Sequence, residues 1–190
     1  MTVLSKKNLR LEARKIRMAA KVIGGINVIE RATTHALKLI SPLPTETTVI
    51  ALYIPVGDEM DCRFLQQTLE NQGYKTALPV ILAKDQPLTF RLWGQGDPLE
   101  DSHHGTQQPA SDAPAVTPTV MITPLLAFNR DCYRLGWGGG YYDRTLAANT
   151  DIQAFGFAYA AQYMEDMPVE AHDWPMHGII TEEGMILPTK

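Results

Sequence analysis

The sequence predicts an α/β fold with a largely parallel sheet that is covered by helices on both faces. Two observations support this: helical and extended segments alternate along the chain, and the run TTVIALYIP has the character of a buried strand. The chain has 190 residues, of which 45% are hydrophobic, so it can bury a substantial core. We therefore expect one domain over residues 1–190.

The first two elements are expected to be helices. Residues 5–21 have apolar side chains at helical spacing, and residues 27–40 follow a capping box formed by Asn27 and Glu30. The apolar face of the first helix carries Leu9, Ala13, Ile16 and Ala20. A break between the two helices is predicted near residues 22–26.

The middle of the chain predicts strands with one intervening helix. Residues 47–55 form the buried strand, and a helix capped by Asp61 runs through RFLQQTLENQ to Gly73. The later strands are expected in KTALPVIL, LTFRLW, TVMITPLLAF, QAFGFAYA, GIIT and EEGMILP. A short helix is predicted from about Tyr141 to Ala148.

One stretch departs from this alternation. Residues 101–119, DSHHGTQQPASDAPAVTPT, are polar, rich in Pro and Ala, and without period, so we predict a long surface loop. His103 and His104 lie in it, and the loop offers too few further ligands for a metal site, which favours a solvated pair.

Charge and cysteine content exclude several classes of protein. The net charge of −4 and the pI near 5.7 argue against a general nucleic-acid binder. Cys62 and Cys132 form no C-x-x-C pair, which suits a reducing compartment, and we expect a cytoplasmic protein. No apolar signal segment begins the chain and no apolar run approaches a membrane span, so we expect no membrane partner.

Residues 134–144, RLGWGGGYYDR, indicate an anion site. They lack the Walker Lys-Ser/Thr and carry Tyr141 where a dinucleotide fingerprint needs its third glycine. Glycines still let backbone N–H groups approach a phosphate, the next helix offers its positive end, and Arg134 supplies a forked cation at the entrance. Asp143 beside a polyphosphate would require a bridging divalent cation such as Mg²⁺. The alternative is a packed glycine-rich turn in which Asp143 only favours the helix dipole.

A basic stripe follows the first helix. Lys6, Arg10, Arg14 and Arg17 are spaced i, i+4, i+8 and i+11, which places them on one side, flanking the apolar face. Such a stripe is either a solvated charged face or a concentrated patch for an anion.

Several motifs, taken in order along the chain, resemble the 5-formyltetrahydrofolate cyclo-ligase family, also called 5,10-methenyltetrahydrofolate synthetases. They are KKNLR, LYIPVGDEMD, LTF, PLLAFNRDCYRLGWGGGYYDRTL, GFAYAAQ and HDWPMHGIITEEG. The resemblance implies a single three-layer α/β/α domain. It also implies conversion of 5-formyltetrahydrofolate to 5,10-methenyltetrahydrofolate with ATP and Mg²⁺, releasing ADP and phosphate.

The resemblance also implies site residues, position by position. The implied nucleotide contacts are Lys6, Lys7, Asn8, Leu9, Arg10, Arg134, Leu135, Gly136, Trp137, Gly138, Gly139, Gly140, Tyr141 and Tyr142. The implied folate contacts are Ile54, Glu59, Trp137, Gly138, Gly139, Gly140 and Tyr141. The implied Mg²⁺ ligands are Asp143 and Asp173, and the groups implied in catalysis are Lys6, Arg134 and Tyr141.

Glu59 has two interpretations. It follows a strand at the end where open α/β sheets place ligands, and its carboxylate could accept two N–H bonds from a pterin edge. Alternatively, it is only a neighbour of the helix-capping Asp61. His172 likewise either orients Asp173 or fills a turn.

By resemblance, the formyl oxygen attacks the γ-phosphate, nitrogen 10 attacks the phosphorylated carbon, and phosphate leaves. Positioning and charge neutralisation then suffice, and no protein nucleophile is required, so Cys62 and Cys132 are expected to be ordinary thiols. Gln108, Asn129 and Gly139 depart from the family's more usual Glu, Asp and, in some members, Lys.

Two other classes of function remain open on sequence alone. They are a different ATP-dependent enzyme on this scaffold and a non-catalytic module that binds folate, or binds RNA through the basic stripe. The expected partner is a reduced folate, with no nucleic acid, and the expected state is a monomer.

Overall fold

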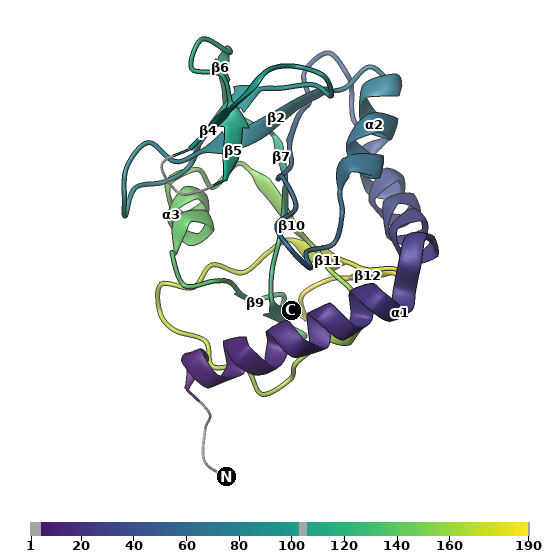
Figure 1. Ribbon diagram of the computed structural model, residues 1–190, viewed down its shortest axis with the longest axis vertical. Helices are drawn as coiled ribbons and strands as arrows, with labels where there is room; N and C mark the ends of the chain where they lie inside the picture. The colour runs from purple at the N-terminus through teal and green to yellow at the C-terminus, as the bar shows by residue number, and fades with distance from the viewer. Residues whose placement is uncertain (1–4, 103–105, 190) are drawn as a thin grey trace.

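The computed structural model describes residues 5–102 and 106–189, and within them the central feature is an eight-stranded sheet (Figure 1). Its strand order is β12-β11-β10-β7-β1-β2-β3-β6; the inner strands run parallel, while β12, β3 and β6 are antiparallel to their neighbours. The strands are β1 (Val49–Ala51), β2 (Lys75–Val80), β3 (Thr89–Leu92), β6 (Ala115–Val116), β7 (Val120–Thr123), β10 (Gln153–Phe157), β11 (Gly178–Ile180) and β12 (Met185–Ile186). The prediction of a largely parallel sheet is confirmed.

Helices cover both faces of this sheet, which gives three layers. They are α1 (Lys6–Ile40), α2 (Arg63–Asn71), α3 (Tyr141–Ala148) and the short 3₁₀ helix η1 (Ala160–Gln162). The end of α1 and α2 lie on one side of the sheet, and α3 lies on the other (Figure 1). Alternation along β1 and the residue after it produces this division, because Ile50 and Leu52 pack with Ile40 of α1, whereas Ala51 belongs to the cluster of Leu146 in α3.

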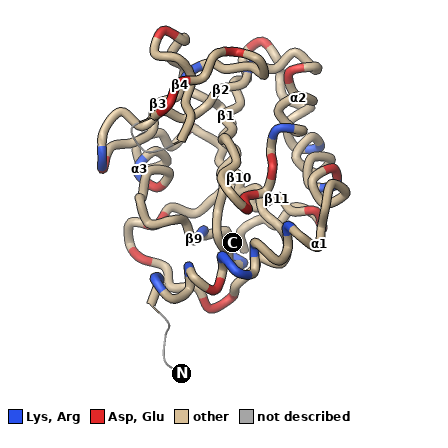
Figure 2. The backbone as a smooth tube through the Cα atoms, viewed as in Figure 1, with Lys and Arg blue, Asp and Glu red and all other residues tan. Residues whose placement is uncertain are grey.

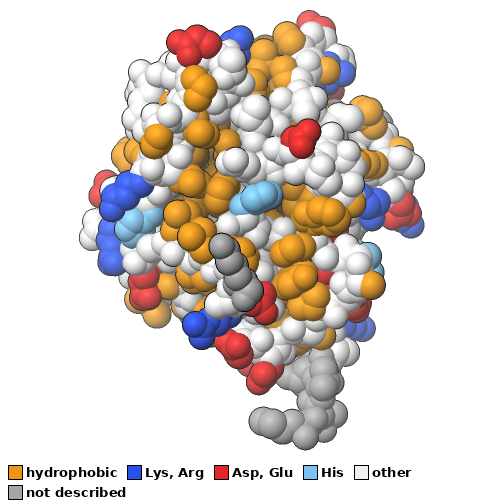
Figure 3. Space-filling view, turned by 180° about the vertical axis from the view of Figure 1, so that it is seen from behind, with side chains coloured by type: hydrophobic (Ala, Val, Ile, Leu, Met, Phe, Trp, Pro, Cys, Tyr) orange, Lys and Arg blue, Asp and Glu red, His pale blue; other side chains and the backbone are white. Residues whose placement is uncertain are grey.

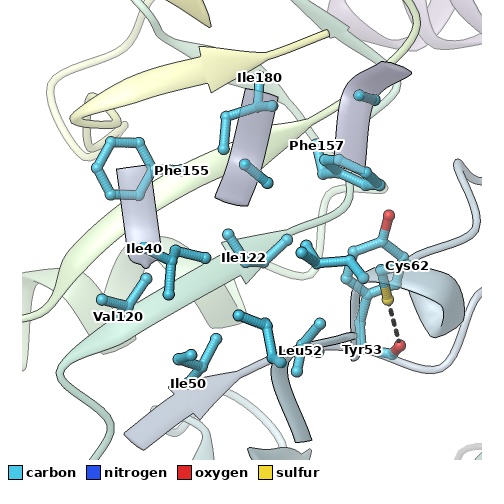
Figure 4. Close-up of a cluster of buried hydrophobic side chains, with 14 of the residues drawn as sticks. Ile40, Ile50, Leu52, Tyr53, Cys62, Val120, Ile122, Phe155, Phe157 and Ile180 are labelled. Carbon is cyan, nitrogen blue, oxygen red and sulfur yellow. Dashed lines mark hydrogen bonds between the residues drawn. The ribbon is translucent and has the colours of Figure 1, made fainter. Parts of the chain in front are cut away.

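Figure 4 shows the core on the α1 side of the sheet. Apolar side chains of four parallel strands project to this one side; those labelled are Ile50, Leu52, Val120, Ile122, Phe155, Phe157 and Ile180. Cys62 completes the cluster next to Tyr53, whose carbonyl oxygen accepts a hydrogen bond from the thiol at 3.0 Å. Sheet faces that are apolar on both sides explain the continuous apolar runs of the sequence.

The two helices predicted at the N-terminus form one helix with a break. Gly25 has φ 55° and ψ −157°, so the helical conformation is interrupted there. Before it, Leu9 and Ala13 pack on Leu135 and its neighbours; after it, the helix packs on the sheet through residues that include Ile40. Because of this break, the two parts of α1 pack on two different surfaces of the protein. It lies two residues before the predicted cap Asn27.

The prediction of a structureless loop over residues 101–119 is wrong. β4 (Leu99–Asp101) pairs with β5 (Gln107–Pro109), and β6 extends the main sheet by pairing with β3. These strands are two or three residues long and partly exposed, too short to show an apolar period. His103 and His104 lie outside the described residues.

Most of the remaining elements lie close to their predicted positions, but the run TVMITPLLAF, predicted as one strand, is divided between β7 and a second short strand at residues 127–128 that belongs to another sheet. α3 begins at Tyr141 and ends at Ala148, as expected, and α2 ends before Gly73, which has φ 90°. The side chain of Asp61 accepts a hydrogen bond from the Arg63 amide at 3.0 Å, although the residue directly before α2 is Cys62. β8 (Ala127–Phe128) and β9 (Arg134–Leu135) form a separate two-stranded ribbon.

Charged positions follow the first part of α1. Figure 2 shows Lys and Arg at intervals along this helix. On the opposite side of the molecule, the visible Lys and Arg side chains lie toward the edges and hydrophobic side chains occupy much of the centre (Figure 3). Among the residues the structure describes, no helix combines the length and apolar character needed to cross a membrane.

Candidate active site

A cavity of about 670 Å³ lies at the carboxyl ends of β1, β2 and β7. Five further parts of the chain complete its walls: the start of α1, the β4–β5 hairpin, residues 134–140, the start of α3, and residues 170–173. This edge is where open parallel sheets present ligand sites, because the loops that follow several strands converge there.

Most of the predicted site residues line this cavity. Those that do are Lys6, Arg10, Ile54, Glu59, Arg134, Leu135, Gly136, Trp137, Gly138, Gly139, Gly140, Tyr141, Tyr142, Asp143 and Asp173. Lys7, Asn8 and Leu9 are not among the lining residues. Leu9 is only 5% exposed and packs with Leu126 and Leu135, so its side chain belongs to the core.

The basic stripe of α1 faces the protein at Lys6, Arg10 and Arg17, whereas Arg14 is exposed. Lys6 Nζ lies 2.7 Å from Asp173 Oδ2, and Arg10 Nε donates to the carbonyl oxygen of Gly136 at 2.9 Å. The guanidinium of Arg14 lies over the ring of Trp137, 5.6 Å from its centroid. Each of these contacts is made to a cavity wall, so the stripe connects α1 with the glycine segment and with Asp173.

Arg134 is not at the entrance, contrary to prediction. The residue is 8% exposed, and its Nη2 lies 2.8 Å from Asp143 Oδ1 while Nη1 contacts Met176 Sδ at 3.2 Å. Burial lowers the pKa of Arg134, and the Asp143 carboxylate opposes that shift. The guanidinium stays charged and forms a fixed cation beneath the glycine segment.

The glycine segment requires bare backbone at specific points. Gly138 has φ 101°, and a Cβ atom there would lie 3.1 Å from Nη2 of Arg10. A Cβ atom on Gly139 would lie 3.0 Å from the ring of Tyr141. The lysine that the family pattern has at this position in some members would therefore need this ring to move. Arg144 holds the other side by donating to the Gly139 carbonyl oxygen at 2.7 Å.

Glu59 is buried at the cavity wall and does not cap α2. Its Oε2 accepts from the Val56 amide at 2.9 Å, and its Oε1 accepts from Trp137 Nε1 at 3.4 Å. Burial raises the pKa of Glu59, and the hydrogen bonds and Arg17 only partly offset this. The helix-neighbour interpretation is therefore not supported, and the carboxylate is available to a ligand.

Two carboxylates on different segments meet the same cavity. Asp143 accepts from the Trp174 amide at 3.2 Å, in addition to its contact with Arg134. Asp173 accepts from the Glu170 amide at 2.7 Å; desolvation raises its pKa, but this bond and Lys6 outweigh that effect and leave the pKa lowered. Each carboxylate thus already lies close to a cation, Asp143 to Arg134 and Asp173 to Lys6.

Sequence reasoning missed Glu170. Single ligand atoms of Glu170, His172 and Asp173 lie within 4.8 Å of one another, and His172 Nε2 is nearer to Glu170 (3.2 Å) than to Asp173 (3.9 Å). His172 is 73% exposed, so it is a peripheral neighbour of Asp173. No motif marked Glu170, because its role depends on a turn that brings it back to Lys6.

The other two departures from the family pattern, Gln108 and Asn129, also have a structural account. Gln108 donates to Glu100 Oε1 at 3.1 Å across the β4–β5 hairpin, so a carboxylate is present beside it. Asn129 Oδ1 accepts from the Tyr133 amide at 3.0 Å, a bond that an aspartate could equally accept.

The cysteines have no nucleophilic character in this fold. Both are buried, and desolvation raises the pKa of Cys62 to about 12 and that of Cys132 to about 11. A thiol with such a pKa is almost entirely protonated at neutral pH, which fits the prediction of ordinary thiols.

Known proteins resemble the chain over nearly its whole length. Residues 3–182 match the family model of the 5-formyltetrahydrofolate cyclo-ligases. A 5-formyltetrahydrofolate cyclo-ligase of Haemophilus influenzae is 32% identical over 95% of this chain and 99% of its own. The NMR structure of an Aquifex aeolicus 5,10-methenyltetrahydrofolate synthetase aligns with TM-score 0.80 at 24% identity, covering 97% of this chain and 93% of that one. A synthetase from Mycoplasma pneumoniae aligns with TM-score 0.74 at 23% identity, covering 94% and 99%.

Proposed function

The chain belongs to the 5-formyltetrahydrofolate cyclo-ligase family, and we propose that it converts 5-formyltetrahydrofolate to 5,10-methenyltetrahydrofolate with ATP and Mg²⁺, releasing ADP and phosphate. One observation carries the detailed proposal. Cations, glycine backbone and two carboxylates line the same cavity as a buried glutamate and aromatic rings. Such a cavity suits a polyphosphate and a flat heterocycle side by side.

The residues present fit a nucleotide with its metal. Lys6, Arg10 and the backbone N–H groups of residues 136–140 suit phosphate oxygens. Asp143 and Asp173 supply carboxylate oxygens, the ligand type that Mg²⁺ prefers. Their contacts with Arg134 and Lys6 also bring positive charge to the phosphate end.

The residues at the other end fit a reduced pterin. Glu59 has one oxygen held firmly by the Val56 amide and a second that is only loosely engaged, so it can accept N–H groups of a ligand. Trp137 and Tyr141 offer ring faces for stacking beside it. Ile54 lines the same region as an apolar contact.

A formamide is a poor electrophile, and expelling its oxygen requires activation. ATP supplies the phosphoryl group that makes this oxygen a leaving group, and Mg²⁺ neutralises the charge of the phosphates. The chain's contribution is to hold two substrates in contact and to place Lys6 near the phosphates, with the Arg134–Asp143 pair fixed behind them. We assign Tyr141 to the wall between the two substrates.

The observed contacts also support the expected absence of nucleic-acid binding. Lys6 and Arg10 of the basic stripe line the cavity and Arg17 is buried, so the stripe does not form an open basic face for a phosphate backbone. We keep the prediction of a monomer, and the two buried free cysteines support our proposal of a cytoplasmic location.

The test is formation of methenyltetrahydrofolate from 5-formyltetrahydrofolate, followed by absorbance. We expect product only when ATP and Mg²⁺ are both present, with one phosphate released per methenyl group. Conversion without ATP, or ATP hydrolysis without conversion, would contradict the proposal.

A further inference from the structure

Arg17 is a buried cation that touches three separate walls of the site. It is 1% exposed, in the first part of α1. Its Nε and Nη2 donate to the two carboxylate oxygens of Asp58 at 3.0 and 3.3 Å, and its Nη1 donates to the Leu125 carbonyl oxygen at 2.9 Å. Its guanidinium also lies 5.5 Å from the centroid of the Trp137 ring. The side chain thus joins the loop after β1, the loop after β7 and the glycine segment.

The hydrogen bonds of Arg17 go to Asp58 and Leu125, and this leaves Glu59 near the guanidinium without a short bond to it. Arg17 Nη1 lies 3.6 Å from Glu59 Oε1, beyond a good hydrogen bond, because the same nitrogen donates to the closer carbonyl oxygen of Leu125. The Glu59 carboxylate therefore lies close to the positive charge of Arg17, and its Oε1 can still accept a hydrogen bond from a ligand. A shorter bond would stabilise the carboxylate but would compete with the ligand.

We propose that Arg17 is a positioning residue that places its positive charge beside Glu59 and keeps Glu59 Oε1 oriented toward the cavity for the N–H groups of the folate. This inference rests on the proposed function for the identity of the ligand. Arg17 itself does not line the cavity, so it acts through Glu59.

The other described titratable groups around Glu59 keep one charge state near neutral pH, so we assign the pH dependence of this cluster to Glu59. Tyr53, Tyr142 and Cys62 all have raised pKa values from burial, so they stay neutral. Desolvation raises the pKa of Asp58, but its bonds to Arg17 outweigh this and leave the pKa lowered, so Asp58 stays charged. Burial raises the pKa of Glu59, and Arg17 counteracts that rise.

Two variants separate geometry from charge. Arg17→Lys keeps the charge but cannot form the fork to Asp58 together with the bond to Leu125, so we expect the KM for 5-formyltetrahydrofolate to rise by about 10- to 100-fold with the KM for ATP nearly unchanged. Arg17→Met also removes the charge. The carboxylate of Glu59 should then take up its proton at higher pH, and the acid limb of kcat/KM for folate should move to higher pH. Raising the pH should partly rescue this variant.

Two control variants test the direction of the shift in the acid limb and the effect of a general loss of stability. Asp58→Asn removes a negative neighbour that raises the pKa of Glu59, so the acid limb should move the opposite way. Because an unpaired Asp58 can destabilise Arg17→Met, the same measurement is made in the double variant with Asp58→Asn. Leu69→Ala, a buried core change away from the cavity, should lower the melting temperature without changing either KM.

The outcomes separate this inference from the proposed function. If the wild type neither binds 5-formyltetrahydrofolate in calorimetry nor converts it, the proposed function fails. If the wild type does both, an equal rise in the two KM values of folded Arg17→Lys overturns the role of Arg17. It is also overturned if the acid limb of folded Arg17→Met does not shift from that of the wild type, or if the acid limb of the double variant does not shift from that of Asp58→Asn alone.

Discussion

At the scale of single residues, Glu59 is an acidic side chain that the folded state does not favour in its charged form. Burial raises its pKa above the usual 4.5, so the folded protein holds this proton more tightly than the unfolded chain. The resulting stabilisation is present at acid pH and is lost as pH rises through the folded-state pKa. We expect Glu59→Gln to melt at or above the wild-type temperature near neutral pH, as measured by thermal unfolding. A clearly lower melting temperature would show that the pairing with Arg17 outweighs desolvation.

Asp143 is the carboxylate whose loss should affect catalysis most. Asp143→Asn keeps the size and an acceptor for the Trp174 amide but removes the charge beside Arg134 and the phosphates. We expect turnover to fall by about 100-fold or more, with a higher Mg²⁺ requirement, in steady-state assays over a Mg²⁺ series. An unchanged rate and unchanged Mg²⁺ dependence would refute this assignment. Asp131→Asn, which changes a carboxylate away from the cavity, is the matched control.

Replacing the two cysteines should have little effect on turnover, in contrast to Asp143→Asn. Cys62→Ser with Cys132→Ser should retain most activity, because both thiols are protonated and neither is placed for covalent chemistry. Some loss of stability is expected, since each serine buries a hydroxyl in an apolar cluster. Activity is compared with circular dichroism on the same sample. A folded but inactive double variant would require a covalent step.

At the scale of elements, the glycine segment is where local sequence and local structure agree best. The helix predicted from Tyr141 to Ala148 is α3, because glycines end the preceding loop and Asp143 lies in the first helical turn. The break in α1 was predicted approximately, as a gap between two helices, and the structure places it at Gly25. Strong local signals were sufficient in both cases.

Elements that depend on distant partners were not predictable. β4, β5 and β6 are short and polar, and they exist because their backbones pair across a turn or with β3. No periodicity over two or three residues can reveal such pairing. The β4–β5 hairpin nevertheless forms part of the cavity wall through residues such as Gln107 and Gln108.

The conformation of the glycine segment can be tested with one methyl group. Gly138→Ala places a Cβ at φ 101° and 3.1 Å from Arg10, so we expect weaker ATP binding by about tenfold and a loss of stability. Gly96→Ala is the control, because φ is 104° there but no atom lies within 4 Å of the added carbon. Calorimetric titration of ATP measures both variants. Equal ATP affinity in the two variants would mean that the segment does not contact the nucleotide.

At the scale of the whole molecule, the site is assembled from segments far apart in the sequence. The start of α1, the loop after β1, residues 134–143 and residues 170–173 meet at one edge of the sheet. The types of residue in the site could be predicted from motifs, and the edge of the sheet where they meet could be predicted from the strand order. The side chains that each site residue contacts could not be predicted. Arg134 was expected at the entrance and is instead buried against Asp143, because the ribbon β8–β9 turns it inward. Arg17 was seen only as one charge in a stripe.

The central claim is that this single cavity binds a nucleotide at the Lys6 end and a folate at the Glu59 end. The most direct test is calorimetric titration of ATP with Mg²⁺, and separately of 5-formyltetrahydrofolate, into Glu59→Gln and Lys6→Met. Gln keeps the size of Glu59 but turns one acceptor into a donor, so folate binding should weaken by about 2–4 kcal/mol with ATP binding nearly intact. Lys6→Met should show the reverse, because it removes a cation from the phosphate end. Equal weakening of both ligands in both variants, or no effect of Glu59→Gln on folate, would contradict the account.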